Sequence, residues 1–171
     1  DKLLLRGGLD SMLWTVSLIL CAMCFGGVME KTKQLETIAM SLMKLAKTTG
    51  SLILTTVLTC ICTNILTSDQ YLSIVLPGRM YKDLYIEKGL DPRNLSRTLE
   101  DSGTVTSPFI PWNTCGATMT TFLGVGPWGP DGFAIYAFLN ILCPIIAVFY
   151  GYTGIGIKKL EVAPKEESVS V

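Results

Sequence analysis

Uncharged, mostly apolar segments alternate with short polar segments along the whole chain. The uncharged runs cover residues 11–29, 48–68, 102–130 and 132–157. Each run is close to or above the roughly 20 residues that a helix needs to cross the hydrocarbon core of a bilayer. The pattern predicts an all-α fold, a polytopic transmembrane helical bundle, with its first helix over residues 11–29 and its last over residues 133–151.

Residues 33–48 have a different periodicity from these runs. Apolar side chains recur there on one face of a helix, at Leu35, Ile38, Ala39, Leu42, Leu45 and Ala46. Lysines and hydroxyl residues occupy the opposite face. A helix with two such faces is typical of a segment lying in the membrane plane, so we predict an interfacial amphipathic helix.

Residues 50–80 are apolar at both ends and polar in the middle, where the sequence reads TNILTSDQ. Helices over residues 50–63 and 70–80 would be about 21 Å and about 16 Å long, each near half of the roughly 30 Å hydrocarbon core. These lengths predict a re-entrant hairpin with its tip at the polar centre. The alternative is one straight crossing through residues 50–78.

The distribution of positive charges helps to choose between the hairpin and the straight crossing, because loops rich in Lys and Arg gather on one side of a membrane. With a hairpin, twelve of the 14 Lys and Arg residues lie on one side of the membrane, and only Lys2 and Arg6 lie on the other. A straight crossing divides the same residues four against ten. The charge pattern therefore favours the hairpin.

Residues 97–125 are predicted to form a discontinuous, or broken, transmembrane helix. Pro108 and Pro111 interrupt its backbone hydrogen bonds, and Asn113 begins a second helical half. Glu100 falls in the first turns, where a carboxylate suits the helix dipole, and Asp101 lies one residue deeper. Such a break leaves backbone carbonyls and amides that can coordinate a cation and an anionic group.

Composition agrees with a membrane location. Only 16% of residues are charged and 49% are hydrophobic, whereas about a quarter of an ordinary soluble domain is charged. The six cysteines lie inside apolar runs and the chain has no histidine, which argues against a zinc site. We expect a multi-pass protein of the cell membrane, either the inner or the plasma membrane, with no cofactor.

Hard oxygen ligands gather in two places, as a sodium site requires. The hairpin tip supplies Asn64, Thr67, Ser68 and Asp69. The broken helix supplies Asp101, Ser102, Thr104, Thr106, Ser107 and Asn113. Because two interrupted helices that meet in mid-membrane point to a transport site, we predict that these ten residues bind the ion or substrate.

Asp69 and Asp101 are the candidate sodium ligands. A carboxylate binds sodium when deprotonated and releases it when protonated, so a single aspartate can couple opposite fluxes by competition. The hypothesis is a secondary active transporter, not an enzyme, with Na+ and H+ as the transported ions.

Three other functions are weighed against this one. A Na+-coupled carboxylate exchanger would hold its substrate at the amides of the broken helix, but the uncharged spans contain no Lys or Arg to pair with it. An aspartyl protease dyad would need a different arrangement from TSDQ and EDSG. A purely structural membrane subunit would not explain why Asp101 stands beside two prolines.

Four segments resemble the C-terminal half of NhaC-type sodium/proton antiporters. They read GGLDSM, FGGVME, NILTSDQYLSIVLPGRMY and LSRTLEDSGTVTSPFIPWNTCGA, from residues 7, 25, 64 and 95 onward. The resemblance implies Na+/H+ exchange, with malate and sodium-lactate exchange in some members. It also implies an inverted-repeat transporter, in which each repeat contributes a hairpin and a broken helix.

Under this resemblance, residues 1–171 are a single membrane domain and a C-terminal fragment that lacks the N-terminal repeat. Its expected partners are that repeat, Na+, H+ and the lipid bilayer, with no nucleic acid and with a homodimer left open. Residues 161–171 are expected to form a disordered tail.

Overall fold

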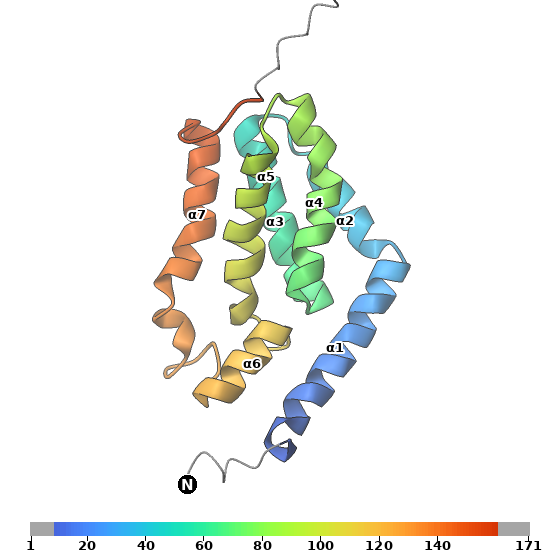
Figure 1. Ribbon diagram of the computed structural model, residues 1–171, viewed down its shortest axis with the longest axis vertical. Helices are drawn as coiled ribbons and strands as arrows, with labels where there is room; N and C mark the ends of the chain where they lie inside the picture. The colour runs from blue at the N-terminus through green and yellow to red at the C-terminus, as the bar shows by residue number, and fades with distance from the viewer. Residues whose placement is uncertain (1–8, 161–171) are drawn as a thin grey trace, which may run out of the picture.

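The computed structural model describes residues 9–160 and is helical throughout this range, apart from turns and one isolated bridge between Leu90 and Lys159. The predicted all-α class is therefore confirmed. Figure 1 shows the long helices running side by side, with α6 lying obliquely at the lower end of the bundle. The predicted tail over residues 161–171 lies outside the described residues.

The first two helices follow one another along one flank of the bundle (Figure 1). Helix α1 covers Leu13–Lys31, after a single 3-10 turn over Asp10–Met12, and α2 covers Gln34–Met43. Lys33 separates them in a left-handed conformation, with φ of 57°. Helix α2 buries Leu35 and Ala39, two residues of the predicted apolar face.

Helix α2 ends five residues before the predicted limit at residue 48. The reason is the next helix, α3 (Thr49–Thr67), which begins with a reciprocal capping box. The Thr48 side chain accepts from the Ser51 amide at 3.2 Å, and the Ser51 hydroxyl accepts from the Thr48 amide at 2.8 Å. Because Thr48 is thus held in an extended conformation, the chain must turn before it.

Helices α3 and α4 (Gln70–Glu87) form an antiparallel hairpin (Figure 1). The chain reverses at Ser68, with φ of 60°, and Asp69 caps α4. This reversal rules out a single straight crossing through residues 50–78. The arms have 19 and 18 residues, about 28 Å and about 27 Å, so both are longer than predicted. Arm length therefore no longer distinguishes a re-entrant hairpin from two full crossings.

The broken helix consists of four parts. Helix α5 (Pro92–Leu99) continues into one π-helical turn, η2 (Glu100–Thr104). After a short 3-10 turn, η3 (Ser107–Phe109), the chain is irregular until α6 (Thr114–Leu123) begins. The interruption therefore coincides with the two prolines, whereas the π-helical turn before it has no sequence signal.

The last span differs from the continuous helix predicted over residues 133–151. A 3-10 turn, η4 (Phe133–Ile135), is separated from α7 (Phe138–Thr153) by two residues. Asn140 lies in the first turn of α7 and its side chain donates to the Val105 carbonyl at 3.0 Å. The start of α7 is therefore fastened to the break of the preceding helix.

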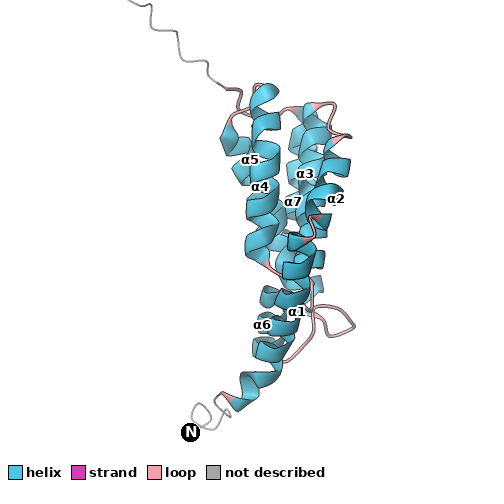
Figure 2. Ribbon diagram, turned by 90° about the vertical axis from the view of Figure 1, so that its right-hand side faces the viewer, coloured by secondary structure: helices cyan, strands magenta, loops and turns pink. Residues whose placement is uncertain are grey.

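Helix α3 lies at the centre of the bundle, against α1, α2, α4, α5 and α7 (Figure 2). Its core residues Leu52, Ile53, Val57 and Cys60 are buried. Its threonines donate to backbone carbonyls one turn earlier, and Thr59 also meets the Tyr81 hydroxyl at 2.8 Å. Because five threonine hydroxyls are satisfied within the helix in this way, α3 remains helical despite its many threonines.

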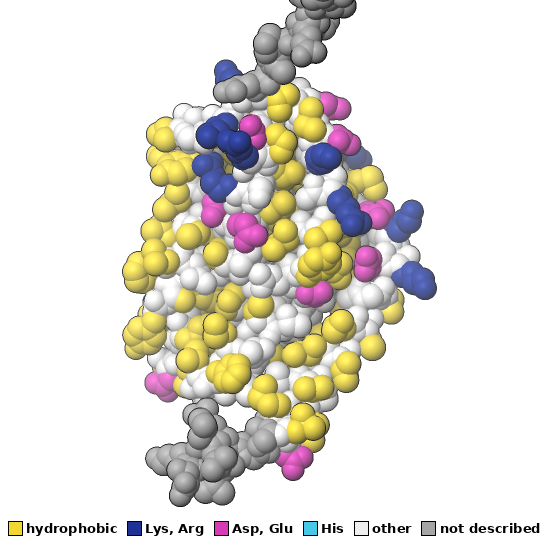
Figure 3. Space-filling view, in the orientation of Figure 1, with side chains coloured by type: hydrophobic (Ala, Val, Ile, Leu, Met, Phe, Trp, Pro, Cys, Tyr) yellow, Lys and Arg dark blue, Asp and Glu magenta, His cyan; other side chains and the backbone are white. Residues whose placement is uncertain are grey.

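Within residues 9–160, two helices, α1 and α3, are long and apolar enough to cross a membrane, and α7 is a shorter apolar helix. Helix α1 exposes large apolar side chains, including Trp14, Phe25 and Val28. Figure 3 shows Lys and Arg concentrated toward the upper end and right flank of the visible face, while the lower part is mainly apolar.

Gly26 gives a test of how α1 packs on the hairpin tip. A Cβ atom at Gly26 would lie 2.6 Å from the Thr67 carbonyl oxygen, whereas a Cβ at Gly27 would meet nothing within 4 Å. We expect Gly26→Ala to destabilise the protein by about 1 to 3 kcal/mol through overpacking. Thermal unfolding in detergent should show a lower melting temperature for Gly26→Ala than for Gly27→Ala. Equal melting temperatures would contradict this packing.

Candidate ion-binding site

The tip of the α3–α4 hairpin lies directly against the break between η2 and α6. The Thr114 amide, at the start of α6, donates to the Ser68 carbonyl at 3.1 Å. The Trp112 indole donates to the Ile65 carbonyl at 2.9 Å. The structure thus brings together the two polar clusters that the sequence predicts separately.

Two fully buried asparagines form the centre of this contact. Asn64 donates to the Gly103 carbonyl at 2.7 Å and to the Thr106 hydroxyl at 3.3 Å. Its side-chain oxygen accepts from Asn113 at 3.2 Å. Both asparagines are 0% exposed. Since buried amides are costly unless paired, this linked pair fixes the tip relative to both sides of the break.

Asn113 also starts α6. Its side-chain oxygen accepts from the Cys115 amide at 3.0 Å, which is an N-cap interaction. Helix α6 can approach the break closely because residue 116 is glycine, where a Cβ atom would lie 2.0 Å from the Ile110 carbonyl oxygen. The positive end of the α6 dipole is therefore held beside the hairpin tip.

Side chains from elsewhere cap backbone carbonyls that the break releases from helical pairing. Asn64 binds the Gly103 carbonyl, Asn140 binds the Val105 carbonyl, and the Trp128 indole donates to the Phe109 carbonyl at 2.7 Å. These carbonyls each keep a second lone pair that can face a cation.

The candidate aspartates have different surroundings. Asp69 is half-buried, and its carboxylate accepts from the Tyr71 amide at 3.0 Å as the N-cap of α4. Asp101 is also half-buried but lies in the π-helical turn. The two carboxylates therefore lie on different elements, α4 and η2. Asp69 has a structural role as the N-cap of α4, whereas the Asp101 carboxylate does not cap a helix.

The predicted hydroxyl ligands are mostly bonded within their own helices. Ser102 donates to the Thr98 carbonyl, Thr106 to the Ser102 carbonyl and Thr67 to the Thr63 carbonyl. Thr104 instead donates to the exposed Glu100 carboxylate. Each hydroxyl oxygen still has acceptor capacity toward a cation. Ser107 differs, because its hydroxyl meets both the Thr104 carbonyl and the Gln70 side chain, at 2.9 Å and 3.3 Å.

An open groove of about 640 Å³ runs beside this contact. Its polar lining comes from Gln70, Thr104, Ser107, Thr114, Cys115, Thr118 and Asn140. Its remaining lining residues are apolar, and none of the lining residues is charged. Within the described residues, no three His, Cys, Asp or Glu side chains gather as a metal cluster. The groove wall therefore offers neutral oxygen atoms to a cation, and Asp101 is not among the residues that line it.

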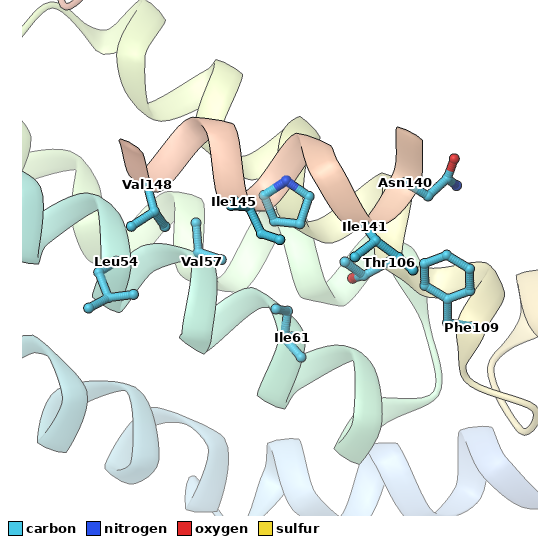
Figure 4. A pocket seen from close by; sticks show the side chains of 10 residues that line it. Leu54, Val57, Ile61, Thr106, Phe109, Asn140, Ile141, Ile145 and Val148 are labelled. Carbon is cyan, nitrogen blue, oxygen red and sulfur yellow. The ribbon is translucent and has the colours of Figure 1, made fainter. Parts of the chain in front are cut away.

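A second, apolar pocket of about 460 Å³ is lined by residues of α3 and α7, which pack directly on each other elsewhere along their length. Figure 4 shows Leu54, Val57 and Ile61 of α3 facing Ile141, Ile145 and Val148 of α7, with Thr106 at the end near the break. Apolar walls on this side of Thr106 limit the polar part of the site to the hairpin tip and the break.

Sequence reasoning missed several residues of this site. Gln70, Gly103, Cys115 and Asn140 all contact the tip or the break. Gln70 has one signal in the sequence, its position beside Asp69 at the polar centre. Gly103 contributes through its backbone, which residue type does not reveal.

A helical hairpin whose tip meets a broken helix is an arrangement typical of membrane transport proteins. The Na+/H+ antiporter family model matches residues 1–155, and the chain belongs to this family. The family assignment makes it part of a membrane protein and confirms the resemblance described from the sequence motifs.

Three relatives show the range of names among similar proteins. The Na(+)/H(+) antiporter NhaC of Alkalihalophilus pseudofirmus is 40% identical over 93% of this chain and 34% of its own length. The arginine/ornithine antiporter ArcD of Halobacterium salinarum is 40% identical over 98% of this chain and 34% of its own length. The malate-2H(+)/Na(+)-lactate antiporter of Bacillus subtilis is 34% identical over 90% of this chain and 32% of its own length.

The chain thus spans about a third of the length of these curated relatives. Their names describe antiporters rather than enzymes. No solved structure matches the chain.

Proposed function

We propose that the complete protein containing this chain is a sodium/proton antiporter, which exchanges Na+ for H+ across the cell membrane. The observation that carries the proposal is the Asn64–Asn113 link between the hairpin tip and the broken helix. Membership of the Na+/H+ antiporter family supports it. So does the resemblance to relatives named NhaC, at 40% and 38% identity.

In this proposal the Asp101 carboxylate binds Na+ or H+ in competition. Carbonyl and hydroxyl oxygens around the break, among them those of Gly103, Thr104 and Ser107, complete the ligand set. Asp69 contributes by ending the hairpin turn and starting α4. The mechanism needs no further cofactor, because the exchange of one cation for the other is itself the reaction.

We further propose that the chain is one repeat of a multi-pass, inverted-repeat transporter, with α3–α4 as its re-entrant hairpin. The remaining length of the relatives would supply the second hairpin and broken helix of the site. Lys and Arg at the upper end in Figure 3 would then face the cytoplasm, following the positive-inside tendency. A homodimer is compatible with the exposed apolar face of α1.

Sodium-jump measurements on proteoliposomes of the complete protein test this function. A pH-sensitive dye inside the vesicles should report loss of internal protons when Na+ is added outside without any organic solute. A potassium jump of equal ionic strength is the control. Proton movement that requires malate, lactate, arginine or ornithine would contradict simple Na+/H+ exchange.

Na+-coupled carboxylate exchange is the second candidate, and the malate/Na+-lactate relative favours it. The groove beside the site has room for a small organic molecule, about 640 Å³. However, no Lys or Arg lines that groove to pair with a carboxylate. The same vesicle experiment, repeated with each organic solute, separates the two candidates.

A further inference from the structure

Gln70 is the first residue of α4, and its side-chain oxygen lies between the two sides of the break. It accepts from the Ser107 hydroxyl, in the turn before the break, at 3.3 Å. It also accepts from the Cys115 thiol, in the first turn of α6, at 2.7 Å. One oxygen atom of the hairpin therefore holds a group from each half of the broken helix.

These contacts differ from the other polar contacts at the tip. Gln70, Ser107 and Cys115 are among the residues that line the open groove, whereas Asn64 and Asn113 are not. Ser107 is 0% exposed, as both asparagines are, so its hydroxyl lies in the buried wall of the groove. Ser107 divides its hydroxyl hydrogen between the Thr104 carbonyl and Gln70. The direction of that hydrogen decides where the Ser107 lone pairs point. Gln70 thus affects how Ser107 presents oxygen to a cation entering from the groove.

We propose that Gln70 is a positioning residue of the ion site. Its carbonyl oxygen fastens the hairpin tip to both halves of the broken helix and orients Ser107 toward the cation. The role in ion affinity rests on the proposed Na+/H+ exchange, while the fastening itself does not. Without this acceptor, the two halves of the broken helix can move apart from the tip, and the Cys115 thiol loses its partner.

Two substitutions distinguish the hydrogen-bonding role of the Gln70 side chain from a role in packing alone. Gln70→Leu has a similar size but no acceptor, whereas Gln70→Glu keeps an acceptor oxygen for Ser107 and Cys115. In the complete protein, Gln70→Leu should raise the sodium KM for proton flux about tenfold, the effect of losing one to two hydrogen bonds, with a smaller change in kcat. Gln70→Glu should keep a sodium KM nearer to that of the unsubstituted protein.

Labelling of Cys115 provides a readout that does not depend on transport. Maleimide modification, followed by mass spectrometry of the peptide containing Cys115, should be faster in Gln70→Leu than in the unsubstituted protein or in Gln70→Glu. Cys60, which is buried in the core on α3, serves as an internal control for general loosening of the fold. Its labelling should stay equally slow in all three proteins.

The outcomes are distinct. Faster Cys115 labelling together with a raised sodium KM in Gln70→Leu supports the proposal. Unchanged Cys115 labelling in Gln70→Leu overturns it, as does an equal sodium KM in Gln70→Leu and the unsubstituted protein. If the unsubstituted protein shows no sodium-driven proton flux, the proposed function fails, and the labelling comparison still decides whether Gln70 fastens the tip to the break.

Discussion

Replacing Asn64 with leucine is expected to abolish sodium-driven proton flux and to lower thermal stability. The substitution removes the bonds from Asn64 to the Gly103 carbonyl and the Thr106 hydroxyl, and the bond from Asn113 to the Asn64 side chain. Each buried polar group left without a partner costs about 1 to 3 kcal/mol. The tip would also separate from the break, so that the ligands no longer share one site.

Thr63→Val is the matched control for Asn64→Leu. Thr63 is the preceding residue, is also buried, and donates only to the Thr59 carbonyl of its own helix. Flux and melting temperature should therefore stay close to those of the unsubstituted protein in Thr63→Val. Flux is compared well below the melting temperature of each variant. Wild-type flux in Asn64→Leu would contradict the link between the tip and the break.

Asp101→Asn is expected to reduce sodium-driven proton flux to the level of empty vesicles. The amide has almost the same shape as the carboxylate but can neither carry the exchanged proton nor neutralise a bound cation. The adjacent Glu100→Gln is the matched control, because the glutamine oxygen still accepts from Thr104 and the side chain is exposed. It should keep most of the flux.

Asp69→Asn distinguishes the two candidate carboxylates. Asparagine is as good an N-cap as aspartate, so α4 should still begin at Gln70. We expect Asp69→Asn to retain flux, whereas loss in Asp69→Asn with retention in Asp101→Asn would transfer the exchange role to Asp69. Unchanged flux in both variants would rule out carboxylate competition as the mechanism.

Local sequence signals predict the interruptions of the helices well. Pro108 and Pro111 mark the break because neither can donate a backbone bond. The polar centre around Asp69 marks the hairpin tip because an aspartate caps a following helix. These signals act over a few residues, so they can be read directly from the chain.

The helix lengths were harder to predict from the same signals. The polar residues Asn64 and Thr67 place the predicted tip at residues 64–67, yet Thr67 donates to a carbonyl one turn earlier and lies within α3. Pro77 lies inside α4, which continues to Glu87. Side-chain hydrogen bonds and tertiary packing outweigh the local propensities at these positions.

The contacts that assemble the site could not be predicted from spacing. Asn64 and Asn113 are 49 residues apart, and Gln70 and Cys115 are 45 residues apart. Only the fold places them together. The π-helical turn at Glu100–Thr104 also has no sequence pattern, although such turns occur frequently at functional sites.

Equilibrium binding of radioactive sodium to the complete purified protein, measured as a function of pH, tests the central claim most directly. If Na+ and H+ compete for Asp101, sodium affinity should fall about tenfold for each unit of pH below the pKa of this carboxyl group. Asp101→Asn should bind sodium weakly and with no such dependence, while Glu100→Gln should behave like the unsubstituted protein. Sodium binding in Asp101→Asn with wild-type affinity and pH dependence would contradict the proposed site.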